Sequence, residues 1–322
     1  MHGACVMSKG DNEQVPSDMR ILLAEDSPVY QRLIAGYLKQ WGFSLELAGD
    51  GTEAWKLLAQ SDAPALALLD WVLPGMSGIE LCRNIRNRGT NERYVYTVLL
   101  TGKTEKQDLV QAMEAGADDY LAKPFIAEEL RARLFAGKRI LDLHQRLLSA
   151  QQSLHFAATH DSLTSLWNRA EILAFLHREL ERGQREGKPI GIALLDIDHF
   201  KAINDSFGHS SGDLVLKELA RRLRAQLRSY DGLGRYGGEE FLLVLPGCDL
   251  QTTIRRLDAL RCSIDHPAFL PNPGMTAVTV SIGATVSRGG GTAECESLLQ
   301  EADAALYRAK QSGRNCLQYS PA

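Results

Sequence analysis

The stretch ALALLD, residues 65–70, decides the fold of the first half of this 322-residue chain. Its unbroken apolar run ends in an acid, which indicates a strand buried on both faces, as at the centre of a parallel sheet. Further strands are expected on either side, at residues 19–26, 43–49, 94–101 and 118–125. Segments of helical periodicity lie at residues 28–42, 51–60 and 103–116. Strands alternating with helices predict an α/β domain with a doubly wound, five-stranded parallel sheet.

Polar side chains follow these predicted strands, at the carboxyl ends where ligands of such sheets bind. Glu25 and Asp26 end the first strand, Asp70 the third and Thr101 the fourth, and Lys123 follows the fifth. Acids that meet at one rim repel each other unless a hard divalent cation such as Mg²⁺ lies between them. Each residue alone is better explained as a cap or a surface charge. Together they favour a site for a phosphoryl group, whose oxygens the hydroxyl and the ammonium would hold.

The segments EDS, LLDWVLPGMSG, LLTG and YLAKPF resemble the receiver domain of bacterial response regulators over residues 19–137. The resemblance implies a flavodoxin-like fold and transfer of phosphate from a cognate histidine kinase to Asp70. Trp71 and Ser77 are minor departures from the commonest pattern. The implied site consists of the Mg²⁺ ligands Glu25, Asp26, Asp70 and the Trp71 carbonyl, the phosphoryl-binding Thr101 and Lys123, and the switch aromatic Tyr120.

A long helix is expected next, over residues 127–160, where Gly137 is the one strong breaker. Its first turns, around Leu130 and Leu134, are expected to pack on the first domain. Farther along, apolar residues alternate steps of three and four, which is the heptad pattern of a helix that pairs with another. This seam predicts a parallel coiled coil over a linker at 138–158, and its residues are Ile140, Leu143, Leu147, Ala150, Leu154 and Ala157.

The second half places carboxylates beside two apolar strands. Asp196 and Asp198 follow the strand at 190–195, and in RYGGEEF, residues 235–241, Glu239 and Glu240 precede another strand. The paired glycines indicate a tight hairpin. A lone GGEE is most often a solvated turn, but neighbouring strands would bring Asp196 beside both glutamates, as a Mg²⁺ site requires. A helix is expected over residues 205–224, and basic residues suited to a nucleoside triphosphate lie at Lys201, Lys310 and Arg314.

The blocks DSLTSLWNR, DIDHFKAINDSFGHSSGD, RSYDGLGRYGGEEF, VTVSIG and ADAALYRAKQSGRN resemble the GGDEF family of diguanylate cyclases, over residues 159–317. Ser165 and Trp167 depart from the commoner pattern, away from the chemistry. The resemblance implies an α+β domain, taken as residues 159–322, with the palm fold of nucleotidyl cyclases and a ferredoxin-like antiparallel core. It also implies synthesis of cyclic di-GMP from two GTP molecules, with release of two pyrophosphates.

The same resemblance implies a role for each matching residue. Glu239 would accept the proton of the 3′-hydroxyl, and Lys201 would stabilise charge on the phosphoryl oxygens. The implied ligands of Mg²⁺ or Mn²⁺ are Asp196, the Ile197 carbonyl, Glu239 and Glu240. The implied substrate contacts are Asn204, His209 and Asp213 on the nucleotide, and Lys310 and Arg314 on the triphosphate tail. Product would inhibit the enzyme at Arg228 and Asp231, although an RxxD pair alone is usually an exposed ion pair.

Composition and patterning limit the partners. A net charge of −4 without a basic domain gives no sign of a nucleic-acid surface. No apolar run reaches the roughly 18–20 residues that span a bilayer, and residues 1–18 resemble a disordered polar tail. The cysteines form no CxxC pair, which indicates idle thiols in the cytoplasm. Joining two guanosines in a two-fold ring requires two domains to face each other, so a homodimer, or a higher oligomer on phosphorylation, is expected.

Two other functions stay open on the sequence alone. One is a catalytically silent receptor that binds cyclic di-GMP at Arg228 and Asp231. The retained acids Asp196, Glu239 and Glu240 argue against it. The other is a cyclase that uses ATP in part. Asp213 argues against that, because a carboxylate accepts from the N1–H and 2-amino groups of guanine, which adenine does not offer in that geometry.

Overall fold

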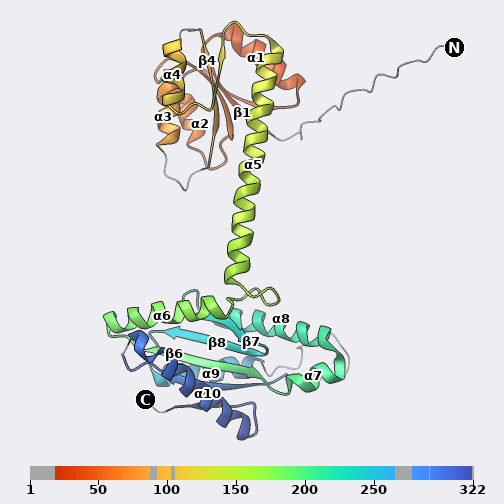
Figure 1. Ribbon diagram of the computed structural model, residues 1–322, viewed down its shortest axis with the longest axis vertical. Coiled ribbons are helices and arrows are strands. Elements are labelled where there is room, and N and C mark those ends of the chain that lie inside the picture. The colour runs from red at the N-terminus through yellow and green to blue at the C-terminus, as the bar shows by residue number, and fades with distance from the viewer. Residues whose placement is uncertain (1–18, 88–92, 103–105, 265–277, 290, 321–322) are drawn as a thin grey trace, which may run out of the picture. The chain divides into compact units, whose positions relative to one another are not determined.

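The structure, a computed structural model, describes residues 19–87, 93–102, 106–264, 278–289 and 291–320 (Figure 1). The chain divides into two compact units between Ser149 and Ala150. The predicted tail at residues 1–18 lies outside the described residues. None of the helices in the described ranges has the length and apolar character needed to cross a bilayer.

The first unit is built on the predicted five-stranded parallel sheet, with strand order β2-β1-β3-β4-β5. The strands are β1 (Arg20–Ala24), β2 (Ser44–Ala48), β3 (Leu66–Asp70), β4 (Tyr96–Thr101) and β5 (Asp119–Ala122). The helices that alternate with them are α1 (Pro28–Gln40), α2 (Gly51–Leu58), α3 (Gly78–Arg86) and α4 (Lys106–Glu114). Alternate residues of β3 enter two different core clusters, Ala67 and Leu69 one and Leu66 and Leu68 the other. The central strand is therefore buried on both faces, as its sequence predicts.

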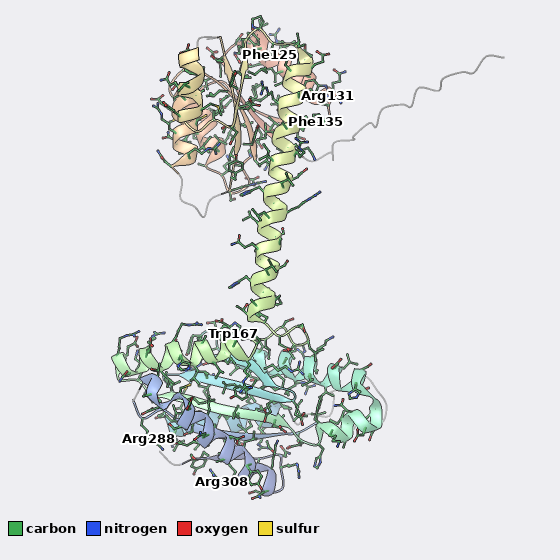
Figure 2. The ribbon with its side chains drawn as sticks, in the orientation of Figure 1. Phe125, Arg131, Phe135, Trp167, Arg288 and Arg308 are labelled. Atoms are coloured by element: carbon green, nitrogen blue, oxygen red, sulfur yellow. The ribbon has the colours of Figure 1, made fainter. Side chains whose placement is uncertain are left out.

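Helix α5 (Ala127–Thr159) packs its first turns on the first unit, as expected. Leu130 and Leu134 are fully buried there. Gly137 allows a close approach, because a Cβ at this position would lie 2.6 Å from ring atoms of Tyr96. On the same helix the guanidinium of Arg131 lies 5.3 Å from the ring centroid of Phe135; both residues are labelled in Figure 2. After Gly137, Leu141 still packs half-buried on the first unit. Other large apolar residues of α5 are exposed, among them Ile140, Leu143, Leu147 and Leu154.

The second unit is an α+β domain with a mixed sheet of order β10-β9-β6-β8-β7. Its strands are β6 (Ile190–Ile197), β7 (Gly232–Gly237), β8 (Glu240–Pro246), β9 (Val280–Val286) and β10 (Leu317–Tyr319). The core is antiparallel, as expected, and β10 adds a parallel edge beside β9. Core clusters place α6 (Arg169–Glu186) and α10 (Cys295–Gln311) on one face, and α8 (His209–Gln226) and α9 (Leu250–Ile264) on the other.

One helix prediction in this unit is wrong in its extent. The segment expected as a single helix over 205–224 is divided between α7 (Phe200–Phe207) and α8. The unit also contains a short 3₁₀ helix, η1 (Gly291–Glu294), just before α10. Gly208 lies between the two helices with a φ of +81°, a left-handed conformation that ends α7 and that glycine adopts readily. The break orients the start of α8 independently of α7.

Candidate phosphoryl and nucleotide sites

The predicted acids of the first unit meet at the carboxyl ends of β1 and β3. Carboxylate oxygens of Glu25, Asp26 and Asp70 all lie within 4.8 Å of one another. Lys123, directly after β5, donates from Nζ to Glu25 Oε2 at 2.6 Å and to Asp70 Oδ2 at 2.7 Å. Its ammonium also lies 4.3 Å from the ring centroid of Tyr30. The strand ends therefore bring one cation against a cluster of three acids.

Burial and charge act against each other in this cluster. Burial raises the pKa of Glu25, and repulsion from Asp70 adds to this effect, while the hydrogen bond from Lys123 opposes it. Burial by itself lowers the pKa of Lys123, but the bonds to Asp70 and Glu25 outweigh it and raise that pKa overall. Lys123 is therefore held as an ammonium, a group suited to bind phosphoryl oxygens.

The other predicted residues of the first unit lie around this cluster. Thr101 is buried at the end of β4, and its carbonyl accepts the Lys123 N–H at 2.6 Å. The Trp71 carbonyl accepts the Gly78 N–H at 3.2 Å. Tyr120 is half-buried on β5, outside the acid cluster, with the Arg133 guanidinium 5.8 Å from its ring centroid.

In the second unit, strand register places Asp196 on β6 directly opposite Glu240 on β8. The two-residue turn Gly238–Glu239 joins β7 to β8, and Gly238 takes a φ of +50°. Arg235 crosses this turn and donates from Nε to the Gly238 carbonyl at 2.9 Å. The predicted hairpin therefore brings Glu239 and Glu240 to the rim that Asp196 also reaches.

The electrostatics of this rim match a cation site. Burial raises the pKa of Asp196, Glu239 and Glu240, and the charge of Asp196 adds to the effect on both glutamates. Lys310 from α10 donates to Asp196 Oδ2 at 2.8 Å, which opposes the rise at that acid. Among the described residues, only Glu25, Asp26 and Asp70 of the first unit form a group of three acids whose oxygens lie within 4.8 Å of one another. The acids at the rim of the second unit are therefore farther apart than those of the first.

The remaining predicted substrate residues lie on α7, α8 and the turn after α10. Asn204 is half-buried on α7 and faces α8, because a Cβ at Gly212 would lie 2.0 Å from its Oδ1. Arg314 has an exposed side chain and a left-handed φ of 63°. The residues predicted to contact substrate that are exposed on α7 and α8 are Lys201, His209 and Asp213.

The two residues of the RxxD segment are placed very differently. Arg228 is exposed and donates from Nη1 to the Tyr230 hydroxyl at 2.7 Å. The side chain of Asp231 is fully buried, accepts the Arg228 N–H at 2.7 Å, and forms an ion pair with Arg256 of α9 through both of its oxygens. Direct contact between Asp231 and a ligand stays a prediction, and it would require this ion pair to open.

Sequence reasoning assigned no role to three residues that hold the site in place. Asp161 binds the Arg235 guanidinium through both carboxylate oxygens at 3.1 Å. Asp198 accepts three hydrogen bonds at the end of β6, and Arg256 neutralises Asp231. Each partner lies far away in the chain, so no local motif revealed these contacts.

Comparisons with known proteins cover both units. The family described as "Response regulator receiver domain" matches residues 21–135, and "Diguanylate cyclase, GGDEF domain" matches residues 158–316. The response regulator PleD of Caulobacter vibrioides is 34% identical over 257 residues, 78% of this chain and 56% of that protein. The diguanylate cyclase DgcP of Pseudomonas aeruginosa is 43% identical over 161 residues, 50% of this chain and 24% of that protein.

A solved structure is also similar to the second half of the chain. It is the coiled coil and GGDEF domain of DgcB from Caulobacter crescentus in complex with c-di-GMP, with a TM-score of 0.52 and 31% identity. The match covers 59% of this chain and 99% of the DgcB chain.

A receiver fold with an acid–lysine cluster, a long helix and a mixed-sheet domain with carboxylates at a GGEE turn define a response regulator with a nucleotidyl-cyclase output domain. This chain belongs to the GGDEF family of diguanylate cyclases and carries a receiver domain before the GGDEF domain. It spans about half the length of PleD and about a quarter of DgcP.

Proposed function

We propose that this protein is a diguanylate cyclase, which joins two GTP molecules into cyclic di-GMP and releases two pyrophosphates. The observation that carries the proposal is the rim where Asp196 lies opposite Glu240 and beside the Glu239 turn, with Lys310 bonded to Asp196. This arrangement combines a group of acids with a cation that can bind a triphosphate. The chain's membership of the GGDEF family supports the same reaction.

The donor set fits Mg²⁺ or Mn²⁺. The carboxylates of Asp196, Glu239 and Glu240 and the Ile197 carbonyl are the oxygen ligands that such ions prefer. Burial raises the pKa of all three acids, and repulsion from Asp196 adds to the rise at Glu239 and Glu240. A dication would relieve that repulsion. When bound, the ion would neutralise the triphosphate and make the 3′-hydroxyl proton easier to lose.

The chain's own residues then bind and orient the substrate. Glu239 accepts the 3′-hydroxyl proton, and Lys201 stabilises the charge that develops on the phosphoryl oxygens. Lys310 and Arg314 hold the triphosphate tail. The residues proposed to contact the rest of the nucleotide are Asn204, His209 and Asp213.

The catalytic assignment is tested with Glu239→Gln, which keeps the size of the side chain but removes the charge. We expect the variant to fold normally and to lose turnover by orders of magnitude, since a proton acceptor and a metal ligand disappear together. Turnover equal to wild type, measured as cyclic di-GMP formed from GTP, would overturn the assignment. If the wild type itself forms no cyclic di-GMP from GTP, the result would instead favour the catalytically silent receptor.

We propose further that phosphorylation of Asp70 by a histidine kinase controls assembly. Mg²⁺ at Glu25, Asp26, Asp70 and the Trp71 carbonyl would support the transfer, and the new charge of roughly −1.5 to −2 would draw Thr101 and Lys123 inward and repack Tyr120. Residues 138–158 would then act as the linker that pairs two chains. The exposed apolar residues of α5 support this pairing, because they leave a seam without a partner in the described chain.

This control is tested with beryllofluoride, a phosphoryl mimic. Light scattering and cyclase activity are both expected to rise in wild type and to stay unchanged in Asp70→Asn. A wild-type mass and rate that do not respond would reject control through assembly.

Product inhibition is the last part of the proposal. Arg228 is exposed and suited to donate to a phosphate or a guanine edge, and Asp231 holds the backbone of Arg228 in place. Bound product would tie the domains into a non-productive arrangement, which couples two distinct sites. Arg228→Ala is expected to lose high-affinity product binding in calorimetry and to continue synthesis where wild type slows. Inhibition at the same product concentration would end this assignment.

A further inference from the structure

A buried carboxylate with no assigned role lies next to the proposed metal site. Asp198 is 5% exposed and stands two residues after Asp196, where β6 ends. Its Oδ1 accepts the Ser281 hydroxyl at 2.6 Å, and its Oδ2 accepts the Thr279 hydroxyl at 2.7 Å. The same Oδ2 accepts the backbone N–H of Asn315 at 2.9 Å. Asp198 therefore ties the end of β6 to the turn that follows α10.

That turn has an unfavourable backbone. Gly313, Arg314 and Asn315 follow one another with φ values of 103°, 63° and 42°. Left-handed conformations are disfavoured for residues with a Cβ, and a run of them persists only where the surroundings hold it. Asn315 is held by two residues: Arg261 donates to its carbonyl at 3.1 Å and to its Oδ1 at 2.8 Å, and its own N–H donates to Asp198.

We propose that Asp198 is a positioning residue for the triphosphate tail: it fixes the strained turn from which Arg314 projects. This inference rests on the proposed cyclase function, which places Lys310 and Arg314 on the tail. Asp196 and Asp198 then have different roles at the end of β6. The Asp196 carboxylate would bind the metal ion at the triphosphate, and the Asp198 carboxylate would fix the position of the Arg314 guanidinium that binds the tail.

The test compares binding of two nucleotides by the full chain in calorimetry. One is a GTP analogue with a methylene group in place of the α–β bridging oxygen, which cannot react, and the other is GMP, which lacks the tail. Asp198→Asn keeps the side-chain size, but its single oxygen cannot accept all three donors. We expect affinity for the analogue to fall about tenfold, or about 1.4 kcal/mol, while affinity for GMP stays unchanged.

Two further variants separate positioning from general destabilisation. Arg314→Ala is expected to lose analogue affinity by itself, and adding Asp198→Asn is expected to cost little more, because the two act through one contact. Leu223→Ala opens a cavity at a fully buried position on α8, and it should lower the melting temperature without changing the ratio of the two affinities.

Two results would overturn the inference. One is an equal loss of affinity for GMP and for the analogue in Asp198→Asn. The other is full additivity of Asp198→Asn and Arg314→Ala. Formation of cyclic di-GMP by the wild type is measured separately, so a failure of the cyclase proposal is distinguishable from a failure of this one.

Discussion

Removal of the Arg256 guanidinium is expected to destabilise the second unit more than the loss of any surface ion pair. The side chain of Asp231 is 0% exposed and that of Arg256 is 15% exposed. Two bonds join them, and the pair raises the pKa of Arg256. Arg256→Ala would leave the charged carboxylate of Asp231 inside the protein, where the Arg228 N–H still donates a hydrogen bond to it.

The expected magnitude follows from that burial. Breaking a buried ion pair by removing one partner costs about 3–5 kcal/mol. Because the Arg228 N–H still donates to Asp231, we expect the lower end of this range, about 3 kcal/mol. A unit of this size loses roughly 2–4 °C in melting temperature per kcal/mol, so the expected shift is about 6–12 °C.

The assay is differential scanning calorimetry of the full chain. The transition of the second unit is identified by its rise with the unreactive GTP analogue. The control is Arg288→Ala, which removes the ion pair with Glu301; Arg288 is labelled in Figure 2. The side chains of that pair are 48% and 24% exposed, so the expected cost is about 1 kcal/mol or less.

A second variant distinguishes an unpaired charge from lost packing. Adding Asp231→Asn to Arg256→Ala removes the buried charge, so the double variant should be more stable than Arg256→Ala alone. If Arg256→Ala shifts the melting temperature no more than Arg288→Ala does, the ion pair does not compensate the burial of Asp231 and the reasoning fails.

Three further predictions concern positions where the structure sets a close contact or a charge. Gly137→Ala places a Cβ 2.6 Å from the Tyr96 ring, so the first unit should lose about 1–3 kcal/mol in denaturant unfolding; a neutral result would show that α5 docks differently. Gly212→Ala places a Cβ 2.0 Å from Asn204 Oδ1 and should weaken GMP binding in calorimetry, whereas unchanged GMP affinity would remove Asn204 from the nucleotide site. Burial raises the pKa of Asp161, but its hydrogen bonds outweigh this and lower the pKa below the ordinary 3.8. This acid therefore stabilises the fold above that pH, and the stability difference between wild type and Asp161→Asn should shrink as the pH falls below about 4; a difference constant across pH 2–6 would contradict it.

The parallel sheet of the first unit was predictable because burial on both faces leaves continuous apolar runs. β3 is buried at every position, and the polar residues that end β1, β3 and β4 lie at one edge by topology alone. Helix α3 was not predicted from the sequence, although Ser77 and Glu80 form a capping box at its start. Its first turn follows the loop after β3, where glycine and proline obscure the periodicity.

The group of acids at the rim of the second unit was also predictable from the order and pairing of the strands. Two strands that carry acids at their adjoining ends must bring them together once they pair, and Asp196 and Glu240 do so in register. The fate of Asp231 was not predictable, because an RxxD segment contains no sign of Arg256, which lies 25 residues later on α9. Long-range ion pairs depend on how helices pack, and periodicity reports only that a helix has a buried face.

Three acids to which sequence reasoning gave no structural role share one physical arrangement. Asp161 holds Arg235 across the GGEE turn, Asp198 holds the turn that bears Arg314, and Asp231 holds the backbone of Arg228. None of these three carboxylates is exposed. Asp198 holds the backbone beside Arg314 and Asp231 holds that of Arg228, the two arginines with proposed ligand contacts. The proposed catalytic acids would set which chemistry the domain performs, whereas these acids hold the segments that carry Arg235, Arg314 and Arg228. Loss of activity after substitution of one of them is therefore no sign of a chemical role, and a change in the affinity ratio between nucleotides is the measurement that separates the two.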